Sequence, residues 1–184
     1  NAQGEMYLTD VPGLLRRDGS RVAASVVSDV TVTYGVNDRA QLAEVGRLLN
    51  RRIVRRWQLE GVTVIDPATT WIDDDATLAP DVTILPNTHI LRATTIAEGA
   101  IIGPDTTLVD CEVGEDAIVR RTDATLAVIG AEATVGPFSF LRPGTVLGAR
   151  GKIGAYVETK NAEIGEGSKV PHLSYVGDAT IGRG

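Results

Sequence analysis

The chain has 184 residues, of which 43% are hydrophobic, 4% aromatic and 23% charged, and this balance excludes disordered, collagen-like and disulfide-rich scaffolds. The formal net charge of -6 gives no global field that would attract nucleic acid or an anionic membrane, so neither is an expected partner. The scarcity of aromatic rings favours a narrow core built from Val, Ile, Leu, Ala and Thr.

Residues 1–36 are predicted to be the C-terminal end of a larger α/β domain. Glu5 to Arg17 follow a helical pattern, and the Val-rich stretch from Val22 to Val32 predicts a strand. This zone is too short to bury a core alone. Because Met6 is the only methionine and the last four residues resemble the start of another repeat, we expect a segment of a longer chain.

Residues 37–60 are predicted to form a linker helix, with Asn37 or Asp38 as its N-cap and Gly61 after its end. The helical period is carried by six apolar residues, Leu42, Val45, Leu48, Leu49, Ile53 and Trp57. The same helix carries five arginines, Arg47, Arg51, Arg52, Arg55 and Arg56. They could meet an anionic partner, although a solvated face is the commoner outcome, and their role stays open.

Residues 61–184 form a repeat with a period of six. Aliphatic residues recur seven times in succession, at Ile72, Leu78, Ile84, Ile90, Ile96, Ile102 and Leu108. After a shortened step to Val113 and an irregular stretch around residues 119–128, the period returns at Ile129. Such a run must be explained before any local propensity, and it is typical of a parallel β-helix.

A small residue stands four positions after most of these aliphatic residues, as at Thr88, Ala100 and Thr106. Because strand side chains alternate, the small residue and the next aliphatic residue both point inward and fill a narrow prism. Gly, Asp and Pro between them, as in Gly103-Pro104-Asp105, are typical of corners. Three sides make a coil of 18 residues, and a right-handed solenoid with longer turns is the less favoured alternative.

Arg142 and Lys160 are predicted to be neighbours on adjacent coils. Arg142 follows the inward-facing Leu141, and Lys160 lies 18 residues later, which is one full coil. Two stacked cations repel each other unless an anion lies between them or acidic side chains neutralise them. Two interpretations therefore stay open: a phosphate clamp, or a wet surface on which Glu158 or Glu163 pairs with Lys160.

His172 falls two residues after the inward-facing Val170, so it is predicted to point outward near a corner, with the hydroxyl of Tyr175 nearby. An exposed histidine can accept a proton at neutral pH, but most exposed histidines have no catalytic role. His89 has no cationic pair and is interpreted as structural. With only two histidines, far apart, a three-histidine zinc site is not expected.

Cys111 is the only cysteine, which excludes an internal disulfide and favours a reducing compartment. No base stands near it in the sequence, so an acyl-carrier role is discounted. The absence of a long apolar run and of a leader at the start predicts a cytoplasmic protein. Asn37 would cap the linker helix, or its carbonyl oxygen could bind a hard cation such as magnesium.

Several motifs, in this order, resemble one enzyme family. They are Asn1 to Asp10, Gly35 to Arg39 with Gln41 and Leu42, Gly61 to Pro67, Gly136 to Phe138, Leu141 to Gly144, Val157 to Lys160 and His172 to Asp178. Together they resemble the bifunctional N-acetylglucosamine-1-phosphate uridylyltransferase / glucosamine-1-phosphate acetyltransferases. The resemblance covers essentially the whole chain, although the family has Asn where Asp38 stands.

The resemblance implies a left-handed β-helix that acetylates glucosamine-1-phosphate from acetyl-CoA. A preceding domain would then join N-acetylglucosamine-1-phosphate to UTP with Mg²⁺, which yields the cell-wall precursor UDP-N-acetylglucosamine. It implies that His172 is the general base, that Arg142, Lys160 and Tyr175 bind the sugar phosphate, and that Asn37 contacts magnesium and the uridine nucleotide. It also implies a homotrimer.

The resemblance further implies that residues 1–36 end the uridylyltransferase domain, that 37–60 form the linker and that 61–184 begin the acetyltransferase domain. The remaining residues of both sites would lie outside 1–184, so we expect this segment alone to have little activity. Two other functions stay open: a sugar-nucleotide pyrophosphorylase with a regulatory or oligomerising β-helix, and a non-enzymatic repeat scaffold.

Overall fold

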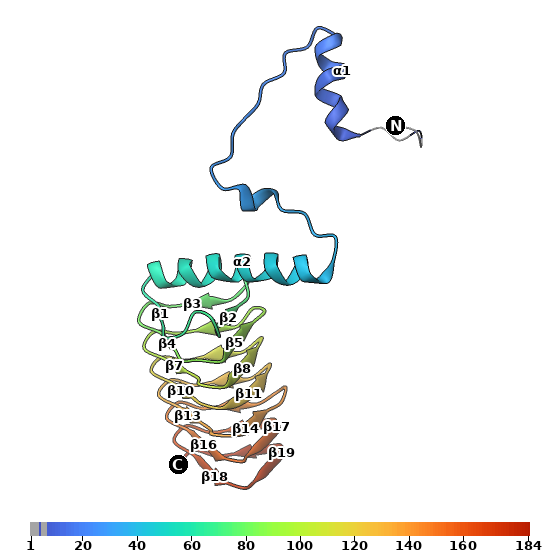
Figure 1. Cartoon of the computed structure of the whole chain (residues 1–184). Helices are drawn as coiled ribbons and strands as arrows, with labels where there is room; N and C mark the ends of the chain where they lie inside the picture. The colour runs from blue at the N-terminus through green and yellow to red at the C-terminus, as the bar shows by residue number, and fades with distance from the viewer. Residues whose placement is uncertain (1–3, 5–6) are drawn as a thin grey trace. The chain divides into compact units, whose positions relative to one another are not determined.

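The structure is a computed structural model that describes residues 4 and 7–184 (Figure 1). Contacts between Cα atoms divide the chain into two units, residues 1–41 and 42–184. Within the described residues, none of the helices combines the length and the apolar character needed to cross a membrane.

The first unit contains the 3-10 helix η1 (Leu8–Asp10), the helix α1 (Val11–Arg17) and the 3-10 helix η2 (Val30–Thr33). The predicted helix is present up to Arg17, whereas its predicted start at Glu5 lies outside the described residues. The predicted strand from Val22 to Val32 is wrong, because none of these residues pairs with another strand. None of the side chains in residues 7–38 is buried, so this part of the chain has no core of its own.

The linker helix α2 (Arg39–Leu59) is present as predicted, and its ends have defined caps. Asp38, rather than Asn37, is the N-cap, since its carboxylate accepts a hydrogen bond of 2.8 Å from the backbone N–H of Gln41. At the other end the backbone N–H of Val62 donates to the carbonyl of Trp57 at 2.9 Å. Gly61 provides the positive φ of 98° that this Schellman ending requires.

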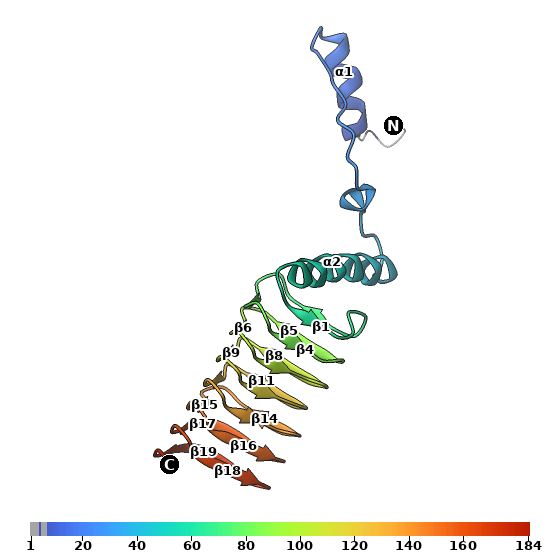
Figure 2. The ribbon, with the colours of Figure 1, turned by 90° about the vertical axis from the view of Figure 1, so that its left-hand side faces the viewer.

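The buried face of α2 consists of Asn50, Ile53, Val54 and Trp57. The predicted apolar stripe is wrong at Leu42 and Leu49, which are exposed, because the helix packs only along its C-terminal half. Figures 1 and 2 show this helix lying across the first coil of the β-helix.

Asn50 joins the helix to the open edge of that coil. Its amide nitrogen donates to the carbonyl of Thr70 at 2.8 Å, and its amide oxygen accepts from the N–H of Ile72 at 3.1 Å. These bonds satisfy strand groups that have no preceding coil to pair with, so α2 caps the edge of the sheet.

The β-helix has three faces made of short parallel strands. The first face is a seven-stranded sheet in the order β1 (Thr63–Val64), β4 (Thr83–Ile84), β7 (Ile101–Ile102), β10 (Ile118–Val119), β13 (Thr134–Val135), β16 (Lys152–Ala155) and β18 (Lys169–His172). The second and third faces together form one sheet, because β17 (Glu158–Ile164) pairs with strands of both.

The second face contains, besides the first parts of β17 and β19 (Tyr175–Ile181), the strands β2 (Trp71–Ile72), β5 (Thr88–Leu91), β8 (Thr106–Val109), β11 (Thr122–Thr125) and β14 (Ser139–Leu141). The third face contains, besides the last parts of β17 and β19, the strands β3 (Thr77–Leu78), β6 (Thr95–Ile96), β9 (Glu112–Val113), β12 (Val128–Ile129) and β15 (Val146–Leu147). The fold class, a left-handed parallel β-helix of hexapeptide repeats after a long helix, is therefore as predicted.

The core is the predicted prism of stacked aliphatic and small residues. Ile84, Ile102 and Ile153 have no measurable exposure, and the small Thr88 and Thr106 are equally buried between them. The buried threonines satisfy their hydroxyls locally, as when Thr88 donates to the carbonyl of Leu85 at 2.7 Å. Small polar residues can therefore fill the prism without unsatisfied groups.

The corners contain residues in the left-handed region of φ, stacked in three columns along the β-helix. The corner between the first and second faces contains Asn87, Asp105, Arg121, Phe138, Tyr156 and Leu173, with φ between 45° and 60°. Most of these are not the Gly or Asn that usually adopt this conformation. Contacts along the column support it, including stacked Phe138 and Tyr156 rings with centroids 5.1 Å apart.

Candidate functional site

Arg142 and Lys160 lie beside each other on adjacent coils, in the register that the period of six predicts. Strand β14 pairs with β17 so that Leu141 is opposite Thr159. The backbone N–H of Arg142 then donates to the carbonyl of Thr159 at 2.8 Å, which places the next residue, Lys160, level with Arg142. Arg142 directly follows β14, and Lys160 lies within β17.

An acidic side chain neutralises only one of these two cations. The guanidinium of Arg142 lies 2.9 Å from the carboxylate of Glu158, and both side chains are about two-fifths exposed. Within the described residues, Lys160 makes no ion pair with Glu158, Glu163 or any other acid. The ion pair of Lys160 with Glu158 or Glu163, which the wet-surface interpretation expects, is therefore not formed, and Lys160 is a residue of intermediate exposure.

Tyr175 brings a hydroxyl to the same place, one coil further along. The pairing of β17 with β19 sets Tyr175 opposite Glu158 and Gly177 opposite Lys160. The Tyr175 ring lies so close over Gly177 that any Cβ there would collide with its hydroxyl oxygen. A glycine at position 177 thus lets the phenol reach toward the position of Lys160.

His172 ends strand β18 on the first face and is exposed, as predicted for a residue near a corner. It stands opposite Ala155 in the ladder, and Leu173 after it has the φ of 50° that turns the chain onto the second face. Two residues, Leu173 and Ser174, separate it from Tyr175. Among the described residues its ring has no hydrogen-bond partner, and it reaches the Arg142 position only across the width of the second face.

His89 and Cys111 differ in exposure. His89 is exposed on the outer side of β5, opposite Trp71 and Thr107 of the neighbouring coils. Cys111 is fully buried, and burial raises the pKa of its thiol. A buried, protonated thiol is a poor nucleophile, which agrees with discounting Cys111 as an acyl carrier.

Asn37 lies just before α2 and is exposed. Its backbone N–H donates to the side-chain oxygen of Gln41 at 2.7 Å. Across residues 4 and 7–184 there is no group of three or more His, Cys, Asp or Glu that could hold a metal ion. The role of Asn37 in binding magnesium or nucleotide stays a prediction.

The arginine cluster of α2 is mostly solvated. Arg56 lies 3.1 Å from the carboxylate of Asp74 and 4.9 Å above the ring of Trp57. These contacts help to hold the C-terminal half of the helix against the first coil. Arg47, Arg51 and Arg55 are exposed along one side of the helix.

Sequence reasoning did not identify an exposed apolar strip beside His172. Phe138, Tyr156 and Leu173 are between 49% and 74% exposed and form the corner column that ends beside His172. Their successive spacings of 18 and 17 residues were the available signal, since they repeat the coil length. Cations and a hydroxyl at one end of the second face, with a histidine at the other, can hold a phosphorylated substrate beside a base.

These features define a hexapeptide-repeat β-helix protein with a candidate phosphate-binding site. Bifunctional protein GlmU of Clavibacter sepedonicus is 69% identical over 182 residues, and that of Kineococcus radiotolerans is 63% identical. The same protein of Micrococcus luteus is 57% identical. Each match covers 99% of this chain, so the family resemblance predicted from the motifs is confirmed along almost its entire length.

The chain spans about 37% of the length of these curated relatives. No family model matches it. Among solved structures, a mutant of perosamine N-acetyltransferase from Caulobacter crescentus, in complex with CoA and GDP-perosamine, is 19% identical with a TM-score of 0.49. That match covers 92% of this chain and 86% of the other.

Proposed function

We propose that this chain is part of a bifunctional enzyme that makes UDP-N-acetylglucosamine, and that its β-helix belongs to the acetyl-transfer site. In this reaction glucosamine-1-phosphate accepts an acetyl group from acetyl-CoA, and the product is then joined to UTP. The similarity to GlmU proteins over 99% of the chain supports the assignment. The observation that carries it is the alignment of Arg142 with an unpaired Lys160.

Arg142, Lys160 and Tyr175 would bind the phosphate of glucosamine-1-phosphate. A phosphate between the guanidinium and the ammonium converts their mutual repulsion into two charge-assisted contacts. The Tyr175 hydroxyl adds a hydrogen-bond donor from the next coil. Glu158, which already holds Arg142 at 2.9 Å, limits the number of conformations that this long side chain can adopt.

His172 would act as the general base. The amine nitrogen of the sugar attacks the thioester carbonyl, the new N–C bond forms, and the proton that the nitrogen loses passes to His172. The C–S bond then breaks, and coenzyme A leaves with a proton as the free thiol. The exposure of His172 and its lack of a partner among the described residues leave its ring available for this step.

The test is the rate of acetyl transfer by the complete protein carrying His172→Ala. We expect the rate to fall about 10²- to 10⁴-fold, the usual contribution of a general base. Release of the free thiol from acetyl-CoA reports acetyl transfer, and uridylyl transfer measured in parallel should stay unchanged. Uridylyl transfer without any thiol release from the unmodified protein would instead indicate a pyrophosphorylase with a non-catalytic β-helix.

His89→Ala is the matched control, since it removes the other histidine, which is also exposed but lies in a coil without the cationic pair. It should leave acetyl transfer unchanged. Near-normal turnover of the His172→Ala protein would remove the base from the mechanism. The homotrimer, the cytoplasmic location and the use of Mg²⁺ by the longer protein stay predictions.

A further inference from the structure

One side of the β-helix is a residue shorter than the sides stacked above and below it. Strand pairing aligns three successive coils, so equivalent sides can be compared residue by residue. The sides run from Ile102 to Leu108, from Val119 to Ala124 and from Val135 to Leu141. The middle side has one residue fewer, in the stretch where the sequence period is irregular.

The missing residue changes what fills the corner. The coils on either side turn through Gly103-Pro104 and Gly136-Pro137, whereas the short coil turns through Arg120-Arg121. The chain is tight here, because a Cβ at Gly136 would collide with the carbonyl oxygen of Arg120. Pro104 and Pro137 are therefore separated along this corner by one coil that has no proline.

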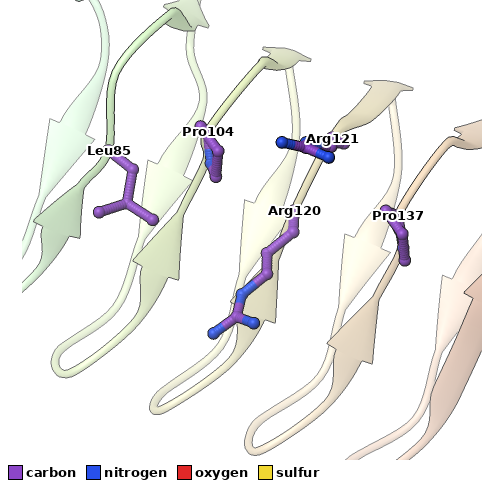
Figure 3. Close-up of a pocket in the computed structure, with 5 residues that line it drawn as sticks. All are labelled: Leu85, Pro104, Arg120, Arg121 and Pro137. Atoms are coloured by element: carbon purple, nitrogen blue, oxygen red, sulfur yellow. The ribbon is translucent and has the colours of Figure 1, made fainter.

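A hollow of about 440 Å³ lies at this interruption, lined by Leu85, Pro104, Arg120, Arg121 and Pro137. Figure 3 shows the two prolines and Leu85 on separate coils, with Arg120 and Arg121 leaving the backbone in different directions between them. Its size is within the range of about 300 to 1,000 Å³ typical of small-molecule sites. Its walls are apolar, and its only charged groups are the two guanidiniums.

The two arginines differ in how far they are neutralised. The Nε of Arg121 lies 3.4 Å from the carboxylate of Asp105, and its guanidinium lies 5.6 Å from the ring centroid of Phe138. Arg120 has neither an ion pair nor a side-chain hydrogen bond with any other residue that the structure describes. The hollow thus offers one uncommitted guanidinium next to apolar walls.

We propose that this hollow binds a small molecule in which a flat apolar body carries one oxyanion, either a phosphate or a carboxylate. The oxyanion pairs with the guanidinium of Arg120, whose planar fork matches both groups. The apolar body rests on Leu85, Pro104 and Pro137. A small anion fits better than a polyanion, because a chain of net charge -6 repels a large anion at long range.

The binding is tested by calorimetric titration of phenyl phosphate into the complete protein. We expect a saturable site that Arg120→Met weakens at least tenfold, because the apolar walls remain but the fork is lost. Arg55→Met, which removes an exposed arginine of α2, should leave the affinity unchanged within twofold. The Arg120-dependent site should persist in Lys160→Gln, whereas any binding that is lost in Lys160→Gln but kept in Arg120→Met belongs to the proposed sugar-phosphate site.

Three further probes define the ligand class. Inorganic phosphate, which lacks the body, and benzyl alcohol, which lacks the charge, should each bind at least tenfold more weakly than phenyl phosphate. Benzoate should bind in the same Arg120-dependent way, and the stronger of the two anions assigns the natural oxyanion. Equal binding by the folded Arg120→Met protein, checked by circular dichroism, or equal binding of inorganic phosphate, would overturn the proposal.

Discussion

The coil through Ala124 and the coil through Leu141 are neighbours that fill the interior of the β-helix with side chains of different size. Leu141 stands six positions after Val135 and fills the prism with a large side chain. Ala124 occupies the equivalent inward position only five positions after Val119. Both are buried and keep the same strand pairing, so a lost residue changes the filling of the prism but preserves the ladder.

The difference between the two coils extends to their outer surfaces. Beside the regular coil, Arg142 and Lys160 stand level across one rung and create a cationic surface. Beside the short side, the corner is left incompletely filled and a hollow lined by Arg120 results. In this fold, regular repeats bring chosen side chains into register, and interrupted repeats create concave surfaces.

The largest expected effect is on the regular coil. Leu141→Ala should lower the free energy of unfolding by about 2 to 5 kcal/mol, because it removes a fully buried side chain from a prism that cannot collapse. Urea denaturation followed by circular dichroism measures this. Leu59→Ala, at an exposed position on α2, should change it by less than about 0.5 kcal/mol. A similar loss from both variants would contradict the assigned core.

The opposite change in the short coil should have a smaller effect. Ala124→Leu restores the residue type found at Leu108 and Leu141, but the shorter side leaves less room for it. We expect a loss of about 1 to 3 kcal/mol from overpacking. An unchanged or higher stability in the same urea assay would mean that the short coil encloses as much space as the regular one.

The smallest expected effect concerns the corner opposite the second face. There Arg150 pairs with Glu166 and, at 3.7 Å, with Glu132, while Glu166 also pairs with Arg183. Because these groups are partly exposed, Arg150→Met should lower the free energy of unfolding by less than about 1 kcal/mol. The loss should shrink in 1 M salt, where the pairs are screened. A loss that salt does not change would point to packing instead.

The sequence predicts the β-helix well because its period is carried by buried residues, which strand alternation places inside without reference to distant contacts. It does not predict the left-handed corner at Phe138 or Tyr156, since their residue types disfavour that conformation and the neighbouring coils support it. The expected strand from Val22 to Val32 fails for a related reason. A Val-rich segment has strand propensity, but the pairing partner decides whether a strand forms.

The candidate site, like the fold, can be predicted from residue spacing only in part. Counting 18 residues places Arg142 beside Lys160, because coil length alone fixes their register. The pairing of Glu158 with Arg142 instead of Lys160, and the position of Tyr175 over Gly177, depend on side-chain conformations that spacing does not determine. Whether His172 and these residues act together depends on the substrate, which no sequence pattern places.

The most direct test of the central claim, that Arg142 and Lys160 hold one phosphate, is a double-mutant cycle on the binding of glucosamine-1-phosphate. Arg142→Gln, Lys160→Gln and the double variant of the complete protein are compared by calorimetry. We predict a coupling energy of about 0.5 to 3 kcal/mol, as expected for two groups that share a partner. Strictly additive losses, or no loss in either single variant, would show that the two cations do not meet on the same phosphate.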